Sequence, residues 1–409
     1  MTRALLLRLF VPYALGNLLS AFHRNVTAIV APDLIDTLRL SAEDIGFLTS
    51  LFFLMFAAAQ LPLGVLLDQY GARRVTAVLF LVAAAGSAIF GSADDMATLA
   101  LGRALMGLGV AVALMGGFKA LVEWLPRERL PFGNSILFVA VGLGTMSSTT
   151  PVHWALGFTD WRGVFFILAG ISVAIAVVLF VTAPDKPRSQ PPPALAEAGK
   201  GMLRVLFDAN FLRCAPLGGI AMGVAMSMSA LWAGPWLADV NGLPRSEVAE
   251  VLFAMAATTV ISALLTGAVV ERLARAGVPI LTTACIGIAG VMAFQVLVAL
   301  DVPASPYALW LPMSFFGATP ILIYTVLMDG FPRQFGGRVN TAYNFVTFAA
   351  AFAAQWGMGA IIDLFPHVAE GAFAPIGYRT ALAAMVAVEA LAFLWLLLAP
   401  RGDMVAKAR

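Results

Sequence analysis

The sequence has very little charge. Only 12% of its 409 residues are Asp, Glu, Lys or Arg, and 61% are hydrophobic, whereas a typical soluble domain carries about 25% charged residues. Such a chain cannot cover a water-facing surface of its own, so the solvent around it must be lipid. Its apolar runs of ~20 residues are long enough to cross the hydrocarbon core as helices, and too long for the strands of a barrel. We therefore predict an all-α membrane protein.

Cysteine and recognisable catalytic groupings are also scarce. Cys214 and Cys285 lie in or beside apolar segments, so we predict buried small hydrophobic residues and no disulfide framework. The sequence contains no nucleophile–base pair, no zinc-ligand spacing and no G-x-x-x-x-G-K-[ST] nucleotide loop. We expect no enzyme activity, no cofactor and no metal. We also expect a monomer in the lipid bilayer with no nucleic-acid partner.

What the sequence does contain is a series of apolar segments in two groups of six. The spans cover residues 8–34, 43–67, 74–92, 96–122, 131–156, 161–183, 210–238, 246–270, 278–300, 306–329, 339–364 and 377–399. The segment between the sixth and seventh spans, "PDKPRSQPPPALAEAGKG", has the composition of a linker. We therefore predict a six-helix bundle over residues 1–184, a linker over 185–205 and a second bundle over 206–409.

The basic residues set the expected orientation. Lys and Arg gather in the cytoplasmic loops of membrane proteins. Eighteen of them fall on the side that holds the N-terminus, and the other side has only Arg39, Arg162, Arg245 and Arg379. We predict that both termini are cytoplasmic and that the protein lies in the cytoplasmic (inner) membrane.

The two halves carry an internal repeat at an offset of 203 residues. "PDLIDTLRLSAEDI" from Pro32 aligns without a gap with "PWLADVNGLPRSEV" from Pro235. Paired six-helix halves of this kind are typical of transporters, whose substrate sites lie near the bilayer midplane. The repeat predicts two pseudo-symmetric bundles.

A polar stripe runs along the first span. Tyr13, Asn17, Ser20, Arg24 and Thr27 follow each other at helical spacing and share one face, as expected for a helix beside a water-filled cavity. No acidic residue lies within a turn of Arg24. Because an unpaired guanidinium at this depth binds carboxylate or phosphate groups, we predict that Arg24 recognises an anion. An interhelical structural bond and snorkelling toward the outer interface are the alternatives.

Other residues are further candidates for substrate contact. His23, with an ordinary pKa of ~6.5, could carry a proton, and a helix–helix hydrogen bond is the alternative. In the second half, Trp232, Tyr324 and Asn344 are candidates, with packing or interfacial anchoring as the alternative. The amide of Asn344 needs a partner at this depth.

The stretch "GVLLDQYGARRV", which starts at Gly64, follows the second span. Gly64 thins the helix end and permits a close approach, and Gly71 permits the turn. Asp68 is a carboxylate at a helix end, able to meet a helix N-terminus or a basic side chain. Arg73 and Arg74 anchor the loop on the inside. A generic cytoplasmic turn is the alternative.

This stretch resembles the loop signature of the major facilitator superfamily, which reads glycine-x-leucine-x-aspartate, then glycine, then basic residues. A degenerate second copy, "GAVVERLARAG", follows the eighth span. The fourth span adds "RALMGLG", in which Arg103, Gly107 and Gly109 resemble the arginine–glycine signature of the family. Gln69, Ala72 and Met106 depart from the pattern.

The resemblance implies a secondary transporter that moves a small solute by alternating access. It also implies that the Asp68 carboxylate latches the two halves by meeting the start of the eleventh span, near Arg338. The conformational switch would then be controlled by Asp68 together with Gly64, Gly71, Arg73, Arg74 and Arg103.

The arginine eight residues before Pro32 resembles the first span of organophosphate antiporters and related anion transporters. Their phosphate-exchanging members add a second arginine on the seventh span, where the repeat register places Ser227. We therefore predict a small organic anion, a singly charged carboxylate rather than a phosphate ester, with protons as a candidate coupled ion.

Three alternatives remain open. Met222, Met226 and Met228 could hold copper(I), although no His or Cys stands at a matching spacing. A drug transporter is a second alternative, but the fifth span reads "GLGTMSSTTP" and lacks the glycine–proline signature of proton-coupled drug antiporters. The third is a solute sensor that transports nothing.

Overall fold

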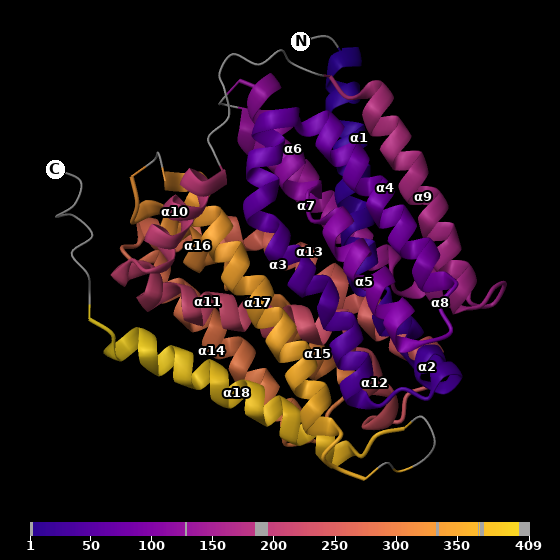
Figure 1. The fold of residues 1–409 in the computed structure, drawn as a ribbon. Coiled ribbons are helices and arrows are strands. Elements are labelled where there is room, and N and C mark those ends of the chain that lie inside the picture. The colour runs from indigo at the N-terminus through magenta and orange to yellow at the C-terminus, as the bar shows by residue number, and fades with distance from the viewer. Residues whose placement is uncertain are drawn as a thin grey trace. The chain divides into compact units, whose positions relative to one another are not determined.

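The computed structural model describes residues 3–126, 129–184, 195–332, 335–366, 368 and 372–400, and the regular secondary structure in these ranges is helical apart from an isolated bridge residue, Ala372 (Figure 1). Eleven helices or helix pairs in them are long and apolar enough to cross a membrane. The remaining expected span is the first one along the chain, residues 8–34. It is formed by α1 (Arg3–Asn25) and α2 (Thr27–Leu38). The all-α membrane fold predicted from composition is confirmed.

The chain divides into two compact units, and each is described here by itself. The first unit holds Met1–Arg39 and Leu51–Leu195, and the second holds Leu40–Ser50 and Ala196–Arg409. The helix α3 (Ala42–Tyr70) therefore begins in the second unit and ends in the first. The other helices of the first unit are α1, α2, α4 (Ala72–Gly91), α5 (Met96–Val110), α6 (Ala113–Trp124), α7 (Leu130–Ser147), α8 (Thr150–Ala155) and α9 (Trp161–Thr182).

Within the described residues, the second unit contains ten further helical segments. They are α10 (Leu195–Leu206), α11 (Ala209–Ser227), the π-helix η2 (Met228–Trp232), α12 (Ala233–Asp239), α13 (Arg245–Arg275), α14 (Ile280–Ala299), α15 (Pro306–Phe316), α16 (Ile321–Asp329), α17 (Gly336–Ile362) and α18 (Pro375–Leu398), of which α10 begins at the boundary. Residues 185–194 of the expected linker lie outside the described residues. The remainder of the linker forms the helix α10, which the linker composition did not predict.

Several spans are interrupted, and the interruptions recur in both units. The first span breaks between α1 and α2, and the fourth breaks between α5 and α6. Their counterparts in the second half are the seventh span, interrupted by η2, and the tenth, divided between α15 and α16. The break at Val26 falls on Ser229 at the repeat offset, inside η2. Paired interruptions of this kind mark binding regions in transporters with internal repeats.

Local sequence explains where several helices begin. Asp95, Asp160 and Asp208 each accept hydrogen bonds from main-chain N–H groups in the following turn. The Thr98 amide and hydroxyl hydrogen bonds hold the pKa of the Asp95 carboxyl below its usual value. Gly71 has a φ of 82° and turns the chain between α3 and α4.

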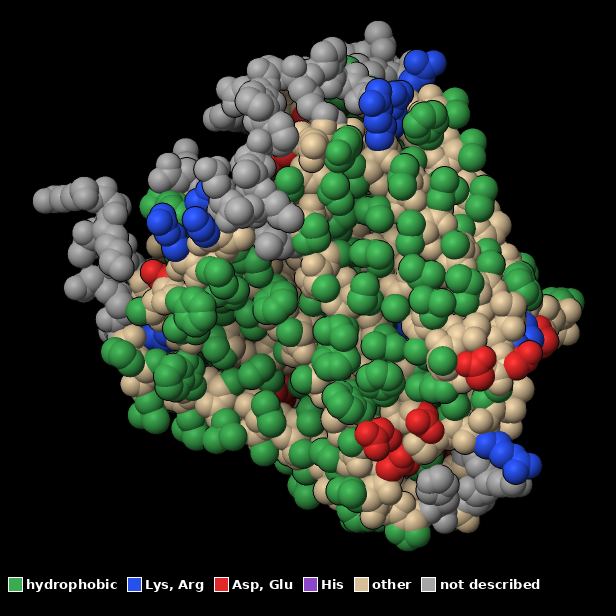
Figure 2. Space-filling model, viewed as in Figure 1, with side chains coloured by type: hydrophobic (Ala, Val, Ile, Leu, Met, Phe, Trp, Pro, Cys, Tyr) green, Lys and Arg blue, Asp and Glu red, His purple; other side chains and the backbone are tan. Residues whose placement is uncertain are grey.

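The lipid-facing character of the chain is visible on its surface. Hydrophobic side chains cover most of the face drawn in Figure 2, and the charged side chains gather in a few places near its margins. Large exposed apolar residues such as Phe180, Leu264 and Leu391 would be unfavourable in water and are expected in a bilayer.

Candidate functional site

The break in the first span lies against a buried arginine of the fourth. The backbone of Val26 stays helical (φ −57°, ψ −30°), but the helical hydrogen bonding is interrupted there, so no main-chain N–H four residues on donates to the carbonyl groups of His23 and Arg24. The Arg103 guanidinium from α5 donates to both carbonyls, at 2.9 Å from Nη1 and 3.4 Å from Nη2. It also lies 4.9 Å from the centre of the Phe52 ring. Arg103 is fully buried, so these contacts hold the end of α1 in place.

The fourth span receives the same support from the first. Asn17 donates from Nδ2 to the Ala113 carbonyl at 3.2 Å, and Ser20 donates from Oγ to the Val110 carbonyl at 3.2 Å. Val110 and Ala113 flank the break between α5 and α6. Each interrupted helix thus donates side-chain hydrogen bonds to main-chain carbonyls at the break of the other. In lipid, such donors are what make a broken helix tolerable.

His23 and Asn25 fasten α1 to two other helices. The His23 ring lies 2.9 Å from the Leu19 carbonyl through Nδ1 and 3.0 Å from Ser87 Oγ on α4 through Nε2. Asn25 donates to Thr145 Oγ1 on α7 at 3.4 Å. Both side chains are buried. The interhelical hydrogen bond expected as the alternative for His23 is therefore present in the structure.

Arg24 differs from its neighbours on α1. Its side chain is half-buried, and within the described residues its guanidinium has neither a hydrogen-bond acceptor nor a carboxylate partner. The main-chain carbonyl of Arg24 is one of the two that accept hydrogen bonds from Arg103. The structure therefore fixes the backbone of Arg24 and leaves the five N–H donors of its side chain available. Two of these donors match the two oxygens of a carboxylate.

The rest of the predicted stripe is deeply packed. Tyr13 and Thr27 are buried together with Asn17 and Ser20, and Thr27 belongs to α2 because the helix breaks before it. The water-filled cavity expected beside this stripe stays a prediction. Asn17 and Ser20 contact α6 and α5, and Arg24 is the half-buried member of the stripe.

In the second unit, two of the three candidates have available polar groups. Tyr324 on α16 and Asn344 on α17 are half-buried, and neither side chain has a hydrogen-bond partner among the described residues. The Tyr324 ring lies 5.9 Å from that of Tyr343, whose hydroxyl donates to the Pro320 carbonyl at 3.0 Å. Trp232 is fully buried and donates from Nε1 to the Gln355 carbonyl at 3.0 Å, which is the packing role expected as its alternative.

The loop after the second span contains an ion pair within the first unit. The Asp68 carboxylate lies 2.5 Å from Lys119 Nζ on α6, and Lys119 also lies 3.6 Å from Glu123. Arg73 lies over the Phe180 ring at 5.6 Å, and the Arg74 side chain is exposed. Lys119 was not among the residues predicted from the sequence. The available signal was a lysine inside the apolar run 96–122, where a charge requires a partner.

The close approach expected at Gly64 is absent from the structure. A Cβ atom built there would meet nothing within 4 Å. Gly107 in the fourth span does have this role, because a Cβ atom would lie 2.5 Å from the Phe52 carbonyl oxygen.

The sequence pattern of the Major Facilitator Superfamily matches residues 13–355. The hexuronate transporter of Escherichia coli strain K12 is 27% identical over 175 residues, which are 42% of this chain and 40% of that protein. The galacturonate transporter of Dickeya chrysanthemi is 26% identical over 166 residues, 40% of this chain and 47% of that protein. The matched segment thus spans less than half the length of these relatives.

Solved structures agree over the whole chain. A bacterial homologue of the human lysosomal transporter Spinster, inward-facing and unoccupied, superposes with a TM-score of 0.80 at 17% identity, covering 98% of both chains. A D-xylose–proton symporter gives a TM-score of 0.74 at 15% identity, covering 98% of this chain and 99% of that one. These likenesses show the fold. The family pattern covers well over half of the sequence, and the chain belongs to the Major Facilitator Superfamily.

Proposed function

We propose that this protein is a secondary transporter that carries a small, singly charged organic anion across the cytoplasmic membrane by alternating access. The observation that carries the proposal is the Arg24 guanidinium, which is half-buried and has no partner among the described residues. A cation at this depth is costly unless it meets water or an anion. A substrate carboxylate would supply two acceptors and one compensating charge.

Carboxylate chemistry also agrees with the proteins that this chain resembles. Two of them are named as hexuronate and galacturonate transporters, and a third, 25% identical over 39% of this chain and 38% of its own length, as a probable sulfoacetate transporter of Cupriavidus necator. All three names denote organic anions; the two sugar acids carry one negative charge at neutral pH, and sulfoacetate, with a sulfonate and a carboxylate, carries two. Ser227 occupies the position that corresponds to Arg24 in the repeat, so the second half adds no matching cation. This favours one negative charge over two.

Tyr324 and Asn344 are the second unit's contribution to the proposal. Their phenol and carboxamide have no hydrogen-bond partner among the described residues, so they provide donors and acceptors for hydroxyl groups. Sugar acids have both hydroxyl groups and a carboxylate. His23, Asn17, Ser20 and Trp232 already have internal partners, and we assign them to support of the site.

The test is a thermal-shift screen on the purified protein with galacturonate, glucuronate and sulfoacetate, and with neutral galactose as the comparison solute. We expect an acid to raise the melting temperature of the wild type and galactose to have no effect. Arg24→Ala should lose the shift and Arg24→Lys should keep part of it, because an ammonium binds the charge without the bidentate geometry. The matched control Arg39→Asn removes an exposed charge at the end of α2 and should respond like the wild type. A shift that survives in Arg24→Ala contradicts the assignment.

Uptake into proteoliposomes distinguishes a transporter from a sensor. The acid that stabilises the protein should accumulate in vesicles with the wild type and fail to accumulate with Arg24→Ala. An imposed proton gradient that speeds uptake would identify protons as the coupled ion. Stabilisation without uptake in the wild type would favour the sensor.

A further inference from the structure

The helix α10 presents an unusual face to the outside. One side of α10 carries Lys200, Leu203 and Arg204 at helical spacing. Phe207 continues this side one residue past the end of the helix, where its amide donates to the Leu203 carbonyl at 3.0 Å. All four are exposed, Leu203 at 53% and Phe207 at 75%, whereas Met202 and Val205 on the other side are buried. This set of four residues is called the α10 outer face. It alternates cationic and apolar side chains on the same surface.

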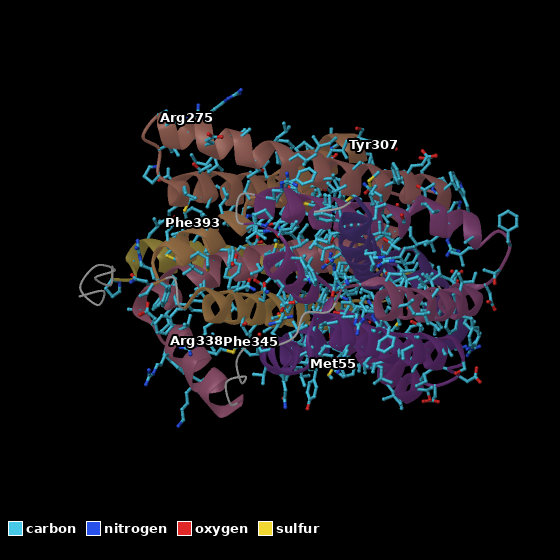
Figure 3. The ribbon with its side chains drawn as sticks, turned by 90° about the horizontal axis from the view of Figure 1, so that it is seen from above. Met55, Arg275, Tyr307, Arg338, Phe345 and Phe393 are labelled. Atoms are coloured by element: carbon cyan, nitrogen blue, oxygen red, sulfur yellow. The ribbon has the colours of Figure 1, made fainter. Side chains whose placement is uncertain are left out.

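The inner side of α10 is fixed to the second unit. A Cβ atom at Gly201 would lie 2.5 Å from Arg338 Nε, so the arginine at the start of α17 packs directly across that glycine. Figure 3 shows Arg338 beside this helix, and basic side chains are visible at the position of α10 in Figure 2. Arg338 is itself exposed and lies 5.2 Å from the centre of the Phe335 ring. Lys200, Arg204 and Arg338 have no ion-pair partner among the described residues.

The chain holds α10 close to the bilayer. The helix ends at Leu206, and α11, which crosses the membrane, begins at Ala209. From Leu206 to Ala209 the chain takes three residue steps, which reach at most about 11 Å when fully extended. With only twelve residues, α10 is too short to cross a membrane itself. It therefore lies at the level of the lipid headgroups, on the side that the basic loops assign to the cytoplasm.

We propose that the α10 outer face binds the anionic cytoplasmic leaflet, with Leu203 and Phe207 inserted among the acyl chains and Lys200, Arg204 and Arg338 on lipid phosphates. Buried apolar area and electrostatic attraction between basic side chains and anionic lipids both strengthen the binding of a helix to a negatively charged membrane. The side of the membrane follows from the orientation in the proposed function. The binding itself requires no transport activity.

The test uses the full-length protein in nanodiscs of phosphatidylcholine, alone or mixed with phosphatidylglycerol, and measures hydrogen–deuterium exchange of the α10 amides. We expect exchange to be roughly tenfold slower with the anionic lipid. Lys200→Gln with Arg204→Gln should abolish this difference between lipids. Leu203→Ser with Phe207→Ser should weaken protection in the anionic nanodiscs although all the charges remain.

The matched control is Arg272→Gln with Arg275→Gln, which removes the same number of exposed charges from the end of α13, on the same side (Figure 3). It should retain the effect of phosphatidylglycerol. Equal exchange in both lipids overturns the proposal, and so does equal protection in detergent, which would mean that the chain itself covers this face. Protection by inorganic phosphate in detergent would assign the cations to a soluble anion and would also overturn it.

Discussion

Arg24 and Arg103 are both arginines inside the membrane, and they differ in what their guanidinium groups contact. Arg103 is fully buried and donates to two main-chain carbonyls. Arg24 is half-buried and has no such partner among the described residues. The first arginine therefore supports the fold, and the second is available to a ligand. We therefore expect substitution of Arg103 to destabilise the protein much more than substitution of Arg24.

Arg103→Leu should destabilise the protein by about 2–4 kcal/mol, because it leaves the His23 and Arg24 carbonyls buried without donors. Arg103→Lys should recover part of the loss, since one ammonium can still donate to a carbonyl. Arg24→Leu is the matched comparison and should change the free energy of unfolding by less than about 1 kcal/mol. Denaturant unfolding in detergent measures all three, and equal losses in Arg24→Leu and Arg103→Leu would contradict the assignment.

Sequence spacing predicted a polar face on the first span and placed Arg24 on it. It did not predict that Asn17 and Ser20 donate to the fourth span. Helical periodicity identifies residues on a common side, and a polar side suits either water or the carbonyls of a broken neighbour. Only the fold shows which of these lies opposite. For His23 and Trp232 the sequence left an internal role open as the alternative, and the fold shows that role for both.

At the scale of elements, the glycines differ in the space around them. Gly107→Ala should destabilise the protein by about 1–3 kcal/mol, because the added methyl group meets the main chain of Phe52, which cannot move aside as a side chain would. Gly64→Ala is the control, since a Cβ atom there meets nothing within 4 Å. It should be neutral or stabilising by up to about 1 kcal/mol through helix propensity. Thermal unfolding of the two variants tests this order, and a larger loss in Gly64→Ala would contradict it.

The apolar runs predicted the membrane helices closely, but the sequence did not show where these helices break. Residues 8–34 and 96–122 read as continuous spans, and each is two helices in the structure. Hydropathy reports the solvent around a segment and is insensitive to a missing main-chain hydrogen bond. A break persists when a neighbour satisfies the freed groups, and this depends on residues far along the chain.

At the scale of the whole molecule, the break at Val26 and the π-helix η2 fall at the same position when the two halves are aligned at the repeat offset of 203 residues. The expected boundary at residues 185–205 remains a prediction. The structure groups Leu40–Ser50 with the second unit. There, the amides of Ala42 and Glu43 each donate to the Asp363 carboxylate at 2.9 Å. A negative charge beside a helix N-terminus is stabilising. No local sequence pattern, however, indicates that the carboxylate comes from a residue some 320 positions away.

The loop signature offers a test of how the molecule changes conformation. Asp68 and Lys119 pair within the first unit with exposed fractions of 48% and 26%, and such partly exposed pairs contribute about 0–1 kcal/mol. Asp68→Asn should therefore leave the free energy of unfolding nearly unchanged. It should slow uptake of the stabilising acid in proteoliposomes about tenfold or more if the carboxylate controls the switch, which corresponds to about 1.4 kcal/mol on the barrier.

Exchanging the two charges distinguishes a local role of Asp68 from a role in the transport cycle. The double variant Asp68→Lys with Lys119→Asp keeps an ion pair in the first unit and should unfold like the wild type. We expect its uptake to stay as slow as that of Asp68→Asn, because a latch needs a negative charge at residue 68 itself. Uptake restored to the wild-type rate would show that Asp68 acts only through Lys119. The latch that the signature implies would then be wrong for this protein, although anion binding at Arg24 would be unaffected.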